Sequence, residues 1–239
     1  QYNMSRPIIG ITTSVETLGS GQVSKQTLGH SYVEAVERAG GCPLILPIVS
    51  DRSTLNAVVS LLDGLVITGG PGITDRLVGE LPDDLPPVST ERDRSDNWIY
   101  EESTKNDLPM LGICYGMQFI NARFGGSIYA DVQNQKGVSP HSPKRDEGRE
   151  VRHGLSVAEN SRLSELVGSG LAEVNSSHIQ AVESLGSGLE ANAKSEDGLI
   201  EGFESQDGRI LCVQFHPEKL PNTIWQKIFE HLVACANAT

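Results

Sequence analysis

The chain has 239 residues, with 19 Lys or Arg and 31 Asp or Glu, so its formal net charge is −12. An acidic surface repels phosphate backbones and anionic lipids, which argues against nucleic acid and membranes as partners. No stretch approaches the roughly 18 apolar residues of a membrane span, and residues 1–7 lack the apolar core of a signal peptide. The four cysteines are far apart without a CxxC pair, so we expect free thiols in a cytoplasmic protein.

The first half of the chain alternates short aliphatic runs with helical patterns, which indicates βαβ units and a parallel sheet. Met4 is a candidate initiator residue. The predicted strands are 8–12, 44–46, 65–68 and 110–113. The predicted helices are one ending at Gly40-Gly41, one from Ser53 to Leu62 with Ser53 as N-cap, one over 92–105, and one between Cys114 and Gly125. Residues 71–91 and 131–149 are expected to be surface loops, the second of them flexible.

The pattern changes after Val151. Strands are predicted over 190–194, 199–204 and 210–215, and Asp197-Gly198 and Asp207-Gly208 are typical hairpin turns between them. The last helix is predicted to start near Pro221, since proline suits a first helical turn. We find no internal repeat, low-complexity segment or linker, so the sequence predicts one α/β domain over residues 1–239.

Gly112-Ile113-Cys114-Tyr115-Gly116 has the form G-x-C-x-G between a predicted strand and a predicted helix. A sharp strand-to-helix turn exposes its middle side chain above the sheet edge and requires small neighbours. The thiol of Cys114 is then at a helix N-terminus, which favours the thiolate. The backbone N–H of Tyr115 is positioned to bind an oxyanion. Cys114 is therefore the candidate nucleophile, and the other three cysteines are interpreted as small core residues.

A thiol nucleophile needs a base, and His216 follows a predicted buried strand within Gln214-Phe215-His216-Pro217-Glu218. The carboxyl ends of parallel strands share one sheet edge, so His216 and Cys114 are expected to meet there. Pro217 favours an extended backbone at His216, which places Glu218 on the same side. Glu218 can then orient the imidazole, which completes a Cys-His-Glu triad.

These motifs resemble those of the class I glutamine amidotransferase-like family. The stretch Gly112–Gln118 and the stretch Gln214–Glu218 carry the general resemblance. The segment Val174–Val182, with the stretches 185–189 and 193–201 after it, resembles the γ-glutamyl-γ-aminobutyrate hydrolase (γ-glutamyl hydrolase peptidase) branch. The resemblance extends from Ile8 to the last helix. It implies a flavodoxin-like three-layer sandwich, with a mostly parallel central sheet, helices on both faces and a few antiparallel strands in the C-terminal half.

The same resemblance implies the remaining site residues. The N–H of Gly70, in the glycine loop 69–72, joins that of Tyr115 in the oxyanion hole. Gln118 helps to hold the glutamyl group. The α-amino and α-carboxylate ends of that group are held by the loop Ser177, His178, Ile179 and Gln180.

Two positions depart from the hydrolase branch. Gly72 stands where that branch tends to have Asp, and Tyr115 stands where it often has Arg. The string Cys114–Gln118 is closer to the glutaminase of GMP synthetase. These departures bear on the leaving group and leave the attack on the carbonyl unaffected.

The predicted function is a cysteine hydrolase that acts on a small γ-glutamyl compound and releases glutamate and an amine. Two alternatives stay open: a glutaminase subunit that delivers ammonia to a separate synthetase partner, and a non-catalytic γ-glutamyl-binding protein. No cofactor is expected, and no metal, because no His, Cys or carboxylate group shows ligand spacing. The partner is a small-molecule γ-glutamyl substrate, and a homodimer is left open.

Overall fold

The structure is a computed structural model that describes residues 6–19 and 21–238; Met4 lies outside them. The described residues divide into two compact units. One takes its residues from Gln1–Thr68, Ser89–Met110 and Glu218–Thr239, and the other from Gly69–Val88 and Leu111–Pro217. Each unit combines segments that are distant in sequence, so the sequence shows no linker at the division. A single domain over 1–239 stays a prediction.

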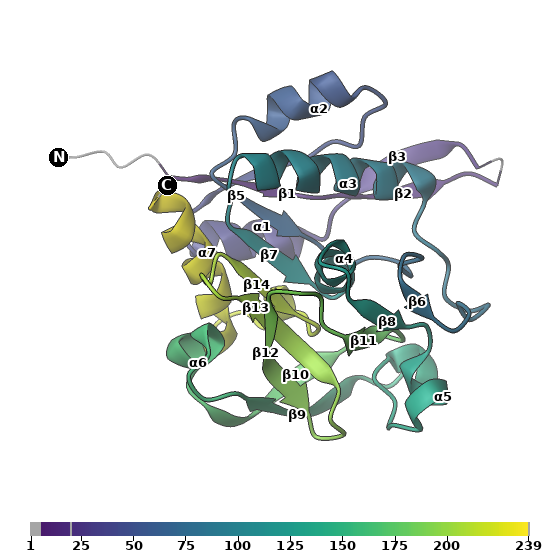
Figure 1. Ribbon diagram of the computed structural model, residues 1–239. Helices are drawn as coiled ribbons and strands as arrows, with labels where there is room; N and C mark the ends of the chain where they lie inside the picture. Colours follow the sequence, from purple (N-terminus) through teal and green to yellow (C-terminus); the bar gives the residue numbers. More distant parts are fainter. Residues whose placement is uncertain (1–5, 20, 239) are drawn as a thin grey trace. The chain divides into compact units, whose positions relative to one another are not determined.

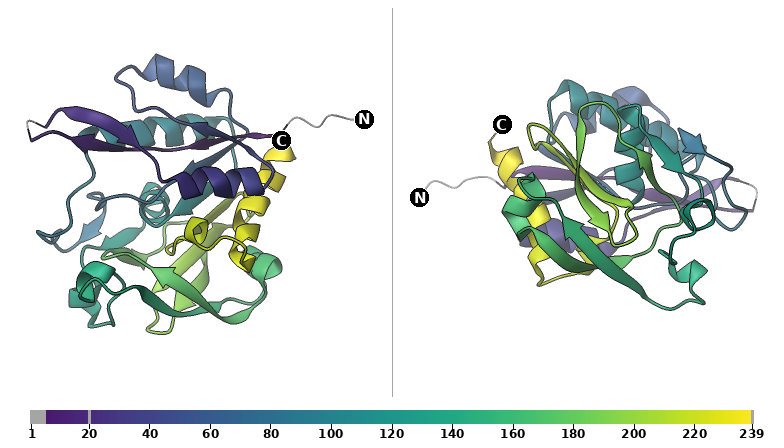
Figure 2. Two further views of the ribbon diagram at one scale, coloured as in Figure 1. Left: turned by 180° about the vertical axis from the view of Figure 1, so that it is seen from behind. Right: turned by 60° about the horizontal axis from the view of Figure 1, so that its bottom comes forward.

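The first unit is a three-layer α/β arrangement. The central strand β1 pairs in parallel with β4 on one side and β5 on the other. Helices α2 and α3 lie on one face of these strands, and α1 and α7 lie on the other (Figure 1). Strands β2 and β3 form an antiparallel hairpin beside them (Figure 2). The elements are β1 (Ile8–Ile11), β2 (Ser14–Thr17), β3 (Val23–Thr27), α1 (His30–Arg38), β4 (Cys42–Ile45), α2 (Arg52–Val59), β5 (Gly64–Ile67), α3 (Thr90–Lys105), the short 3₁₀ helix η3 (Ile224–Gln226) and α7 (Lys227–Asn237).

The helices of this unit pack through apolar stripes of helical period. In α1 the buried residues are Tyr32, Ala35 and Val36, spaced at i, i+3 and i+4. The stripe of α7 is wider and consists of Ile228, Phe229, Leu232, Val233 and Ala236. The apolar patterns in the sequence predicted both helices.

Helix α3 begins at Thr90, capped by Ser89, and not at residue 92. Two further predicted helix starts are wrong. Helix α2 begins at Arg52, and its N-cap is Asp51, whose side chain accepts a hydrogen bond from the Thr54 N–H at 2.9 Å. The C-terminal helical segment begins as the 3₁₀ turn at Ile224, capped by Thr223, and not near Pro221. In both cases a side-chain acceptor that satisfies a free N–H group decides where the helix starts.

The second unit is built mainly from antiparallel strands. Its strand order is β10-β9-β12-β13-β14-β7, with β11 paired to β13 and to β8, and β6 paired to β8. The neighbours from β10 to β14 are antiparallel. Both predicted Asp-Gly hairpins are confirmed, since β12 pairs with β13 and β13 with β14. The elements are β6 (Leu77–Val78), β7 (Met110–Ile113, in this unit from Leu111), α4 (Tyr115–Arg123), β8 (Ser127–Tyr129), α5 (Val132–Lys136), the 3₁₀ helix η1 (Pro143–Arg145), β9 (Val151–Val157), α6 (Arg162–Val167), β10 (Gly170–Ser176), β11 (Ala181–Ser184), β12 (Leu189–Ser195), β13 (Ile200–Ser205) and β14 (Ile210–Val213).

The two segments predicted as loops contain regular structure. Strand β6 and a parallel bridge between Gly72 and Pro87 lie in the first. The second contains α5 and η1, and Asp131 caps α5 by accepting from the Asn134 N–H at 3.1 Å. Their polar composition concealed them, because short elements have little apolar periodicity. The predicted α/β fold class is confirmed.

Candidate active site

Cys114 occupies a strained turn between β7 and α4. Its φ is 53° and its ψ is −107°, a conformation that costs free energy for a residue with a side chain. A Cβ atom on Gly112 would lie 2.8 Å from the Cys212 sulfur and 2.8 Å from the Gly116 carbonyl oxygen. The turn therefore requires glycine at 112, as the G-x-C-x-G pattern predicted.

The thiol of Cys114 is buried, with 7% of the residue exposed. Burial by itself raises the pKa of this thiol. The charge of His216 and a hydrogen bond with its side chain lower it, as do the charge of His178 and the N–H of Tyr115, and the net pKa is below the ordinary value. Cys114 is thus prepared to react as a thiolate. Burial raises the pKa of Cys212, and all four cysteines are free thiols. The interpretation as core residues is wrong for Cys42, which is exposed, whereas Cys235 is half-buried.

His216 follows β14, at the point where the sequence predicted it. Its backbone is held by Asn175 at the end of β10: the His216 N–H donates to Asn175 Oδ1 at 2.9 Å, and Asn175 Nδ2 donates to the His216 carbonyl at 3.0 Å. The second unit therefore brings Cys114 and His216 together. Glu218 is 1% exposed and lies in the 3₁₀ turn η2 (Pro217–Lys219). Its pairing with the His216 ring stays a prediction.

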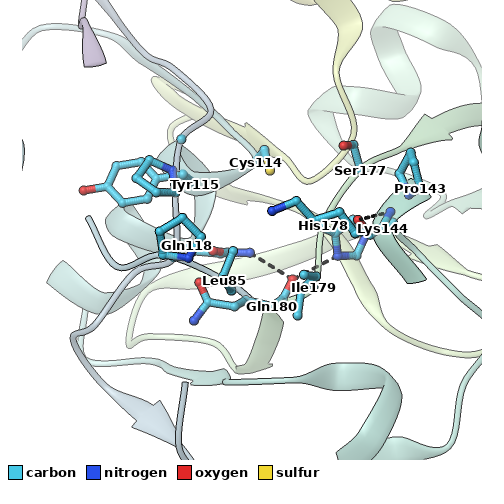
Figure 3. A pocket seen from close by; sticks show the side chains of 15 residues that line it. Leu85, Cys114, Tyr115, Gln118, Pro143, Lys144, Ser177, His178, Ile179 and Gln180 are labelled. Atoms are coloured by element: carbon cyan, nitrogen blue, oxygen red, sulfur yellow. Dashed lines mark hydrogen bonds between the residues drawn. The ribbon is translucent and has the colours of Figure 1, made fainter. Parts of the chain in front are cut away.

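A cavity of about 230 Å³ opens beside the sulfur. Gly70 and Tyr115, the two predicted oxyanion-hole residues, line it together with Cys114. The Tyr115 N–H bonds the sulfur, and its phenol ring points away from the sulfur (Figure 3). The role of these two residues as an oxyanion hole stays a prediction.

The other predicted substrate-binding residues line the same cavity: Gln118, Ser177, His178, Ile179 and Gln180. The carbonyl of Gln180 accepts hydrogen bonds from Gln118 Nε2 at 3.0 Å and from His178 Nδ1 at 2.9 Å (Figure 3). Ser177 is exposed at this wall, whereas Ile179 is buried. The wall is thus fixed by hydrogen bonds before any substrate binds.

The side chain of Gln180 has a structural contact. Its Oε1 accepts from the Ile73 N–H at 2.8 Å, and its Nε2 donates to the Ile73 carbonyl at 3.0 Å. This pair connects the segment after the glycine loop to the start of β11. The amide of Gln180 is occupied by the protein backbone, which favours a positioning role for this residue.

His178 is buried. Its Nε2 lies 3.2 Å from Oε1 of Glu201, a carboxylate with 0% exposure. Burial lowers the pKa of His178, but the adjacent charge of Glu201 outweighs this effect, and the net pKa is raised. His141 and His153 are close by, and the four residues place ligand atoms within 4.8 Å of one another. Of the described residues, this is the group that could hold a metal ion.

Several residues of the site were not predicted, and three of them make contacts that matter here. Asn175 holds the backbone of His216, Gln214 accepts a hydrogen bond from Gln118 Nε2 at 3.0 Å, and Lys144 lines the cavity. Asn175 and Gln214 lie inside two of the motifs that carry the family resemblance. Their closeness in sequence to His178 and His216 is the signal that could have identified them as site residues. Lys144 lies in a segment interpreted as a flexible loop, and no local pattern distinguishes it.

Comparison with known proteins identifies the family. Residues 7–218 match the family described as Peptidase C26. The chain is 36% identical over 211 residues to a Schizosaccharomyces pombe protein named "Putative glutamine amidotransferase", which covers 84% of this chain and 79% of that protein. It is 30% identical over 227 residues to the γ-glutamyl-γ-aminobutyrate hydrolase of Escherichia coli K12, covering 90% and 87% of the two chains.

The fold has a solved counterpart. A crystal structure of a "putative GMP synthase" protein from Thermoplasma acidophilum matches with a TM-score of 0.64 at 19% identity, covering 98% of this chain and 96% of the other. This likeness concerns the fold alone. No described helix is long and apolar enough to cross a membrane. With the sequence match over residues 7–218, the chain belongs to the Peptidase C26 family of class I glutamine amidotransferase-like hydrolases.

Proposed function

We propose that this protein is a cysteine hydrolase that cleaves the γ-glutamyl amide bond of a small γ-glutamyl compound. One observation carries the proposal: a strained, buried thiol is paired with His216 and opens onto a small cavity. A low thiol pKa, an adjacent base and an open space beside the sulfur are the requirements of nucleophilic acyl transfer. The family membership supports glutamyl as the acyl group.

The reaction proceeds in two halves. The Cys114 thiolate attacks the γ-carbonyl carbon, and the backbone N–H groups of Gly70 and Tyr115 stabilise the oxyanion. When the C–N bond breaks, His216 gives its proton to the departing amine and the glutamyl group remains as a thioester. His216 then takes a proton from water, which attacks the thioester. Glutamate leaves and the Cys114 thiolate is regenerated beside protonated His216. In this proposal Glu218 orients the imidazole throughout.

The cavity favours a substrate of the γ-glutamyl-γ-aminobutyrate kind. Its volume of about 230 Å³ suits one glutamyl group and a short amine rather than a polypeptide. Gly72 allows Leu85 to pack closely over the loop, since a Cβ at 72 would lie 3.0 Å from Leu85 Cγ. Leu85 lines the cavity. An aspartate at 72 would displace it, so the glycine gives this chain a more apolar cavity, suited to the methylene groups of an amine.

A second candidate is a glutaminase subunit that supplies ammonia to a synthetase. The string Cys114–Gln118 favours it, because Tyr115 stands where the hydrolase branch often has Arg. Such a subunit works on glutamine and is nearly idle until its partner binds. A free-standing hydrolase instead has full activity alone.

The test is glutamate release from a panel of γ-glutamyl amides that includes γ-glutamyl-γ-aminobutyrate and glutamine. The wild-type protein alone should turn over γ-glutamyl-γ-aminobutyrate or a related amide, and Cys114→Ala should be slower by several orders of magnitude. Cys42→Ala is the matched control, because Cys42 is an exposed free cysteine. Retention of most activity by Cys114→Ala would contradict the nucleophile assignment.

Two other results would favour the alternatives. Slow turnover of glutamine with no turnover of larger amides would favour the glutaminase subunit. No turnover, together with no labelling of Cys114 by a glutamine-analogue electrophile, would favour a non-catalytic binding protein.

A further inference from the structure

Three histidines and one glutamate gather beside the cavity, which His178 lines, and we call them the histidine–glutamate cluster: His141, His153, His178 and Glu201. They come from four separate places in the second unit: the segment before η1, strand β9, the loop between β10 and β11, and strand β13. Because no two are close in sequence, local ligand spacing could not reveal them. The expectation of no metal relied on that spacing alone.

A β-bulge presents Glu201 to the histidines. Gly202 pairs with Ala193 and Ile200 pairs with Lys194, so Glu201 is an extra residue in β13. Bulges of this kind redirect a side chain and often lie beside functional sites. Glu201 is completely buried. Burying a carboxylate is costly unless it is paired, so a positive partner is required here.

The hydrogen bonds around the cluster fix which ring nitrogen of each histidine carries a proton. His178 Nδ1 lies 2.9 Å from the Gln180 carbonyl, and His153 Nδ1 lies 3.0 Å from the Gly154 carbonyl. His141 Nε2 lies 2.9 Å from the Asp197 carboxylate. A nitrogen facing such an acceptor must donate, so the opposite nitrogen of each neutral ring carries a lone pair.

Those three lone pairs converge on Glu201. His178 Nε2 is 3.2 Å from Oε1, His141 Nδ1 is 3.7 Å from Oε1, and His153 Nε2 is 3.7 Å from Oε2. The Nε2 atoms of His153 and His178 and both Glu201 oxygens are buried without a hydrogen-bond partner in the described chain. Ser176 Oγ lies 3.3 Å from His141 Nδ1, but it donates to the His141 carbonyl at 2.8 Å.

A cation among these atoms resolves the arrangement. One proton on His178 satisfies a single nitrogen and a single oxygen, and leaves His153 Nε2 and the second Glu201 oxygen facing each other unpaired. Protonating two or all three rings would gather two or three positive charges around one buried carboxylate, which is electrostatically costly. A divalent ion accepts all four electron pairs at once.

We propose that the histidine–glutamate cluster is a zinc site with His141 Nδ1, His153 Nε2, His178 Nε2 and one oxygen of Glu201 as ligands. Three imidazoles and one carboxylate form a donor set that Zn²⁺ accepts in tetrahedral geometry. Bonds of about 2.0–2.2 Å place tetrahedral ligand atoms about 3.3–3.6 Å apart. The separations of 3.2–3.7 Å to Glu201 are close to this value.

The hydrogen bonds made by the outward-facing histidine nitrogens also agree with a zinc site. In zinc sites each histidine usually donates its other N–H to a carbonyl or a carboxylate, as all three do here. With four protein ligands the site is closed, which is typical of structural zinc. His178 also lines the cavity. The ion therefore serves to fix the loop over Ser177–Gln180, and thereby the cavity wall that Gln118 contacts.

The experiment uses untagged full-length protein, stripped with a chelator and titrated with ZnSO₄. Bound metal is counted by mass spectrometry after desalting, and thermal unfolding is followed in parallel. We expect one Zn²⁺ per chain and a higher Tm with zinc, because an ion that binds only the folded state stabilises it. Neither readout depends on enzymatic activity.

Three variants locate the site. Glu201→Gln keeps the shape and supplies amide hydrogens for the histidine lone pairs, so it should fold but lose zinc and the rise in Tm. Asp197→Asn weakens the hydrogen bond that orients the His141 ring. It should lower the zinc affinity about 10–100-fold. The matched control His30→Gln removes an exposed histidine outside the cluster and should bind zinc like the wild type.

Two outcomes would overturn the zinc site. One is a stripped wild-type protein that binds no zinc, and the other is equal zinc binding by wild type and Glu201→Gln. Should Glu201→Gln fail to fold, Co²⁺ added to the stripped wild type decides. Intense visible bands of tetrahedral Co²⁺ support the site, and the weak bands of octahedral Co²⁺ contradict it.

Discussion

The side-chain amide of Asn175 holds the backbone of His216 through two reciprocal hydrogen bonds of 2.9 and 3.0 Å. Asn175 is at the end of β10 and His216 follows β14, so the contact joins segments that are distant in sequence. It fixes the point from which the imidazole reaches Cys114. Asn175 is therefore a positioning residue in the proposed mechanism.

Replacing Asn175 should disturb catalysis more than binding. In Asn175→Ala the two hydrogen bonds are lost, and a small displacement of the base can lower kcat by up to about 100-fold. KM should change little, because Asn175 does not line the cavity. Steady-state kinetics with a γ-glutamyl amide measures the split. An unchanged kcat would show that the backbone of His216 is held adequately by other contacts.

The reactivity of Cys114 should persist to a lower pH than that of an ordinary thiol. Burial raises the pKa of its thiol, but His216, and to a smaller extent His178, outweigh burial and leave the pKa lowered in the folded protein. The thiolate and its alkylation by iodoacetamide therefore remain as the pH falls below the ordinary thiol pKa. In His216→Gln the effect of burial remains, so the alkylation midpoint should move to higher pH.

Peptide mass spectrometry assigns the alkylated cysteine in this experiment. Cys212 is the internal control: burial raises its pKa, and it should stay unmodified in the folded protein. A Cys42→Ser background removes the exposed thiol. Identical alkylation profiles with and without His216 would show that the imidazole does not control the thiol.

Gly112→Ala should destabilise the fold. The new methyl group would lie 2.8 Å from the Cys212 sulfur and 2.8 Å from the Gly116 carbonyl oxygen, and the backbone at Gly116 cannot yield easily. Overpacking of this kind costs about 1–3 kcal/mol of the free energy of unfolding. Urea denaturation measures it, with Gly19→Ala as the control, because a Cβ at Gly19 meets nothing within 4 Å. Equal stability of both variants would show that the turn between β7 and α4 is not crowded at residue 112.

Lys144→Ala should weaken substrate binding. Lys144 lines the cavity, and a γ-glutamyl substrate carries an α-carboxylate that a cation can bind. Losing a charged hydrogen bond should raise KM about tenfold, with a smaller effect on kcat. Lys144→Arg keeps the charge and should stay near the wild-type KM. If the KM of Lys144→Ala matches that of the wild type, another group binds the carboxylate.

Glu218→Gln tests the third member of the proposed triad. An amide cannot stabilise the imidazolium or enforce the correct tautomer, so kcat should fall by roughly 10²–10⁴-fold. Thermal unfolding checks that the buried substitution leaves the fold intact. A folded Glu218→Gln protein with wild-type kcat would remove Glu218 from the catalytic machinery.

The sequence determined the features that depend on neighbouring residues. Glycine spacing around Cys114 specified the strained turn, because a side chain at 112 has no room. Alternating aliphatic and helical patterns gave the α/β class, and the Asp-Gly pairs gave the two hairpins. The position of His216 at the end of a predicted strand identified it as a candidate base. Each of these follows from local sterics or periodicity.

The tertiary structure decided what depends on contacts between distant segments. It paired Cys114 with His216, placed Asn175 behind that histidine, and buried His178 against Glu201. Strand pairing from β9 to β14 brings these groups together, and a bulge in β13 presents Glu201. No short stretch of sequence specifies these contacts. They depend on pairing between strands that are distant in sequence, and such strands come together only when the whole chain folds.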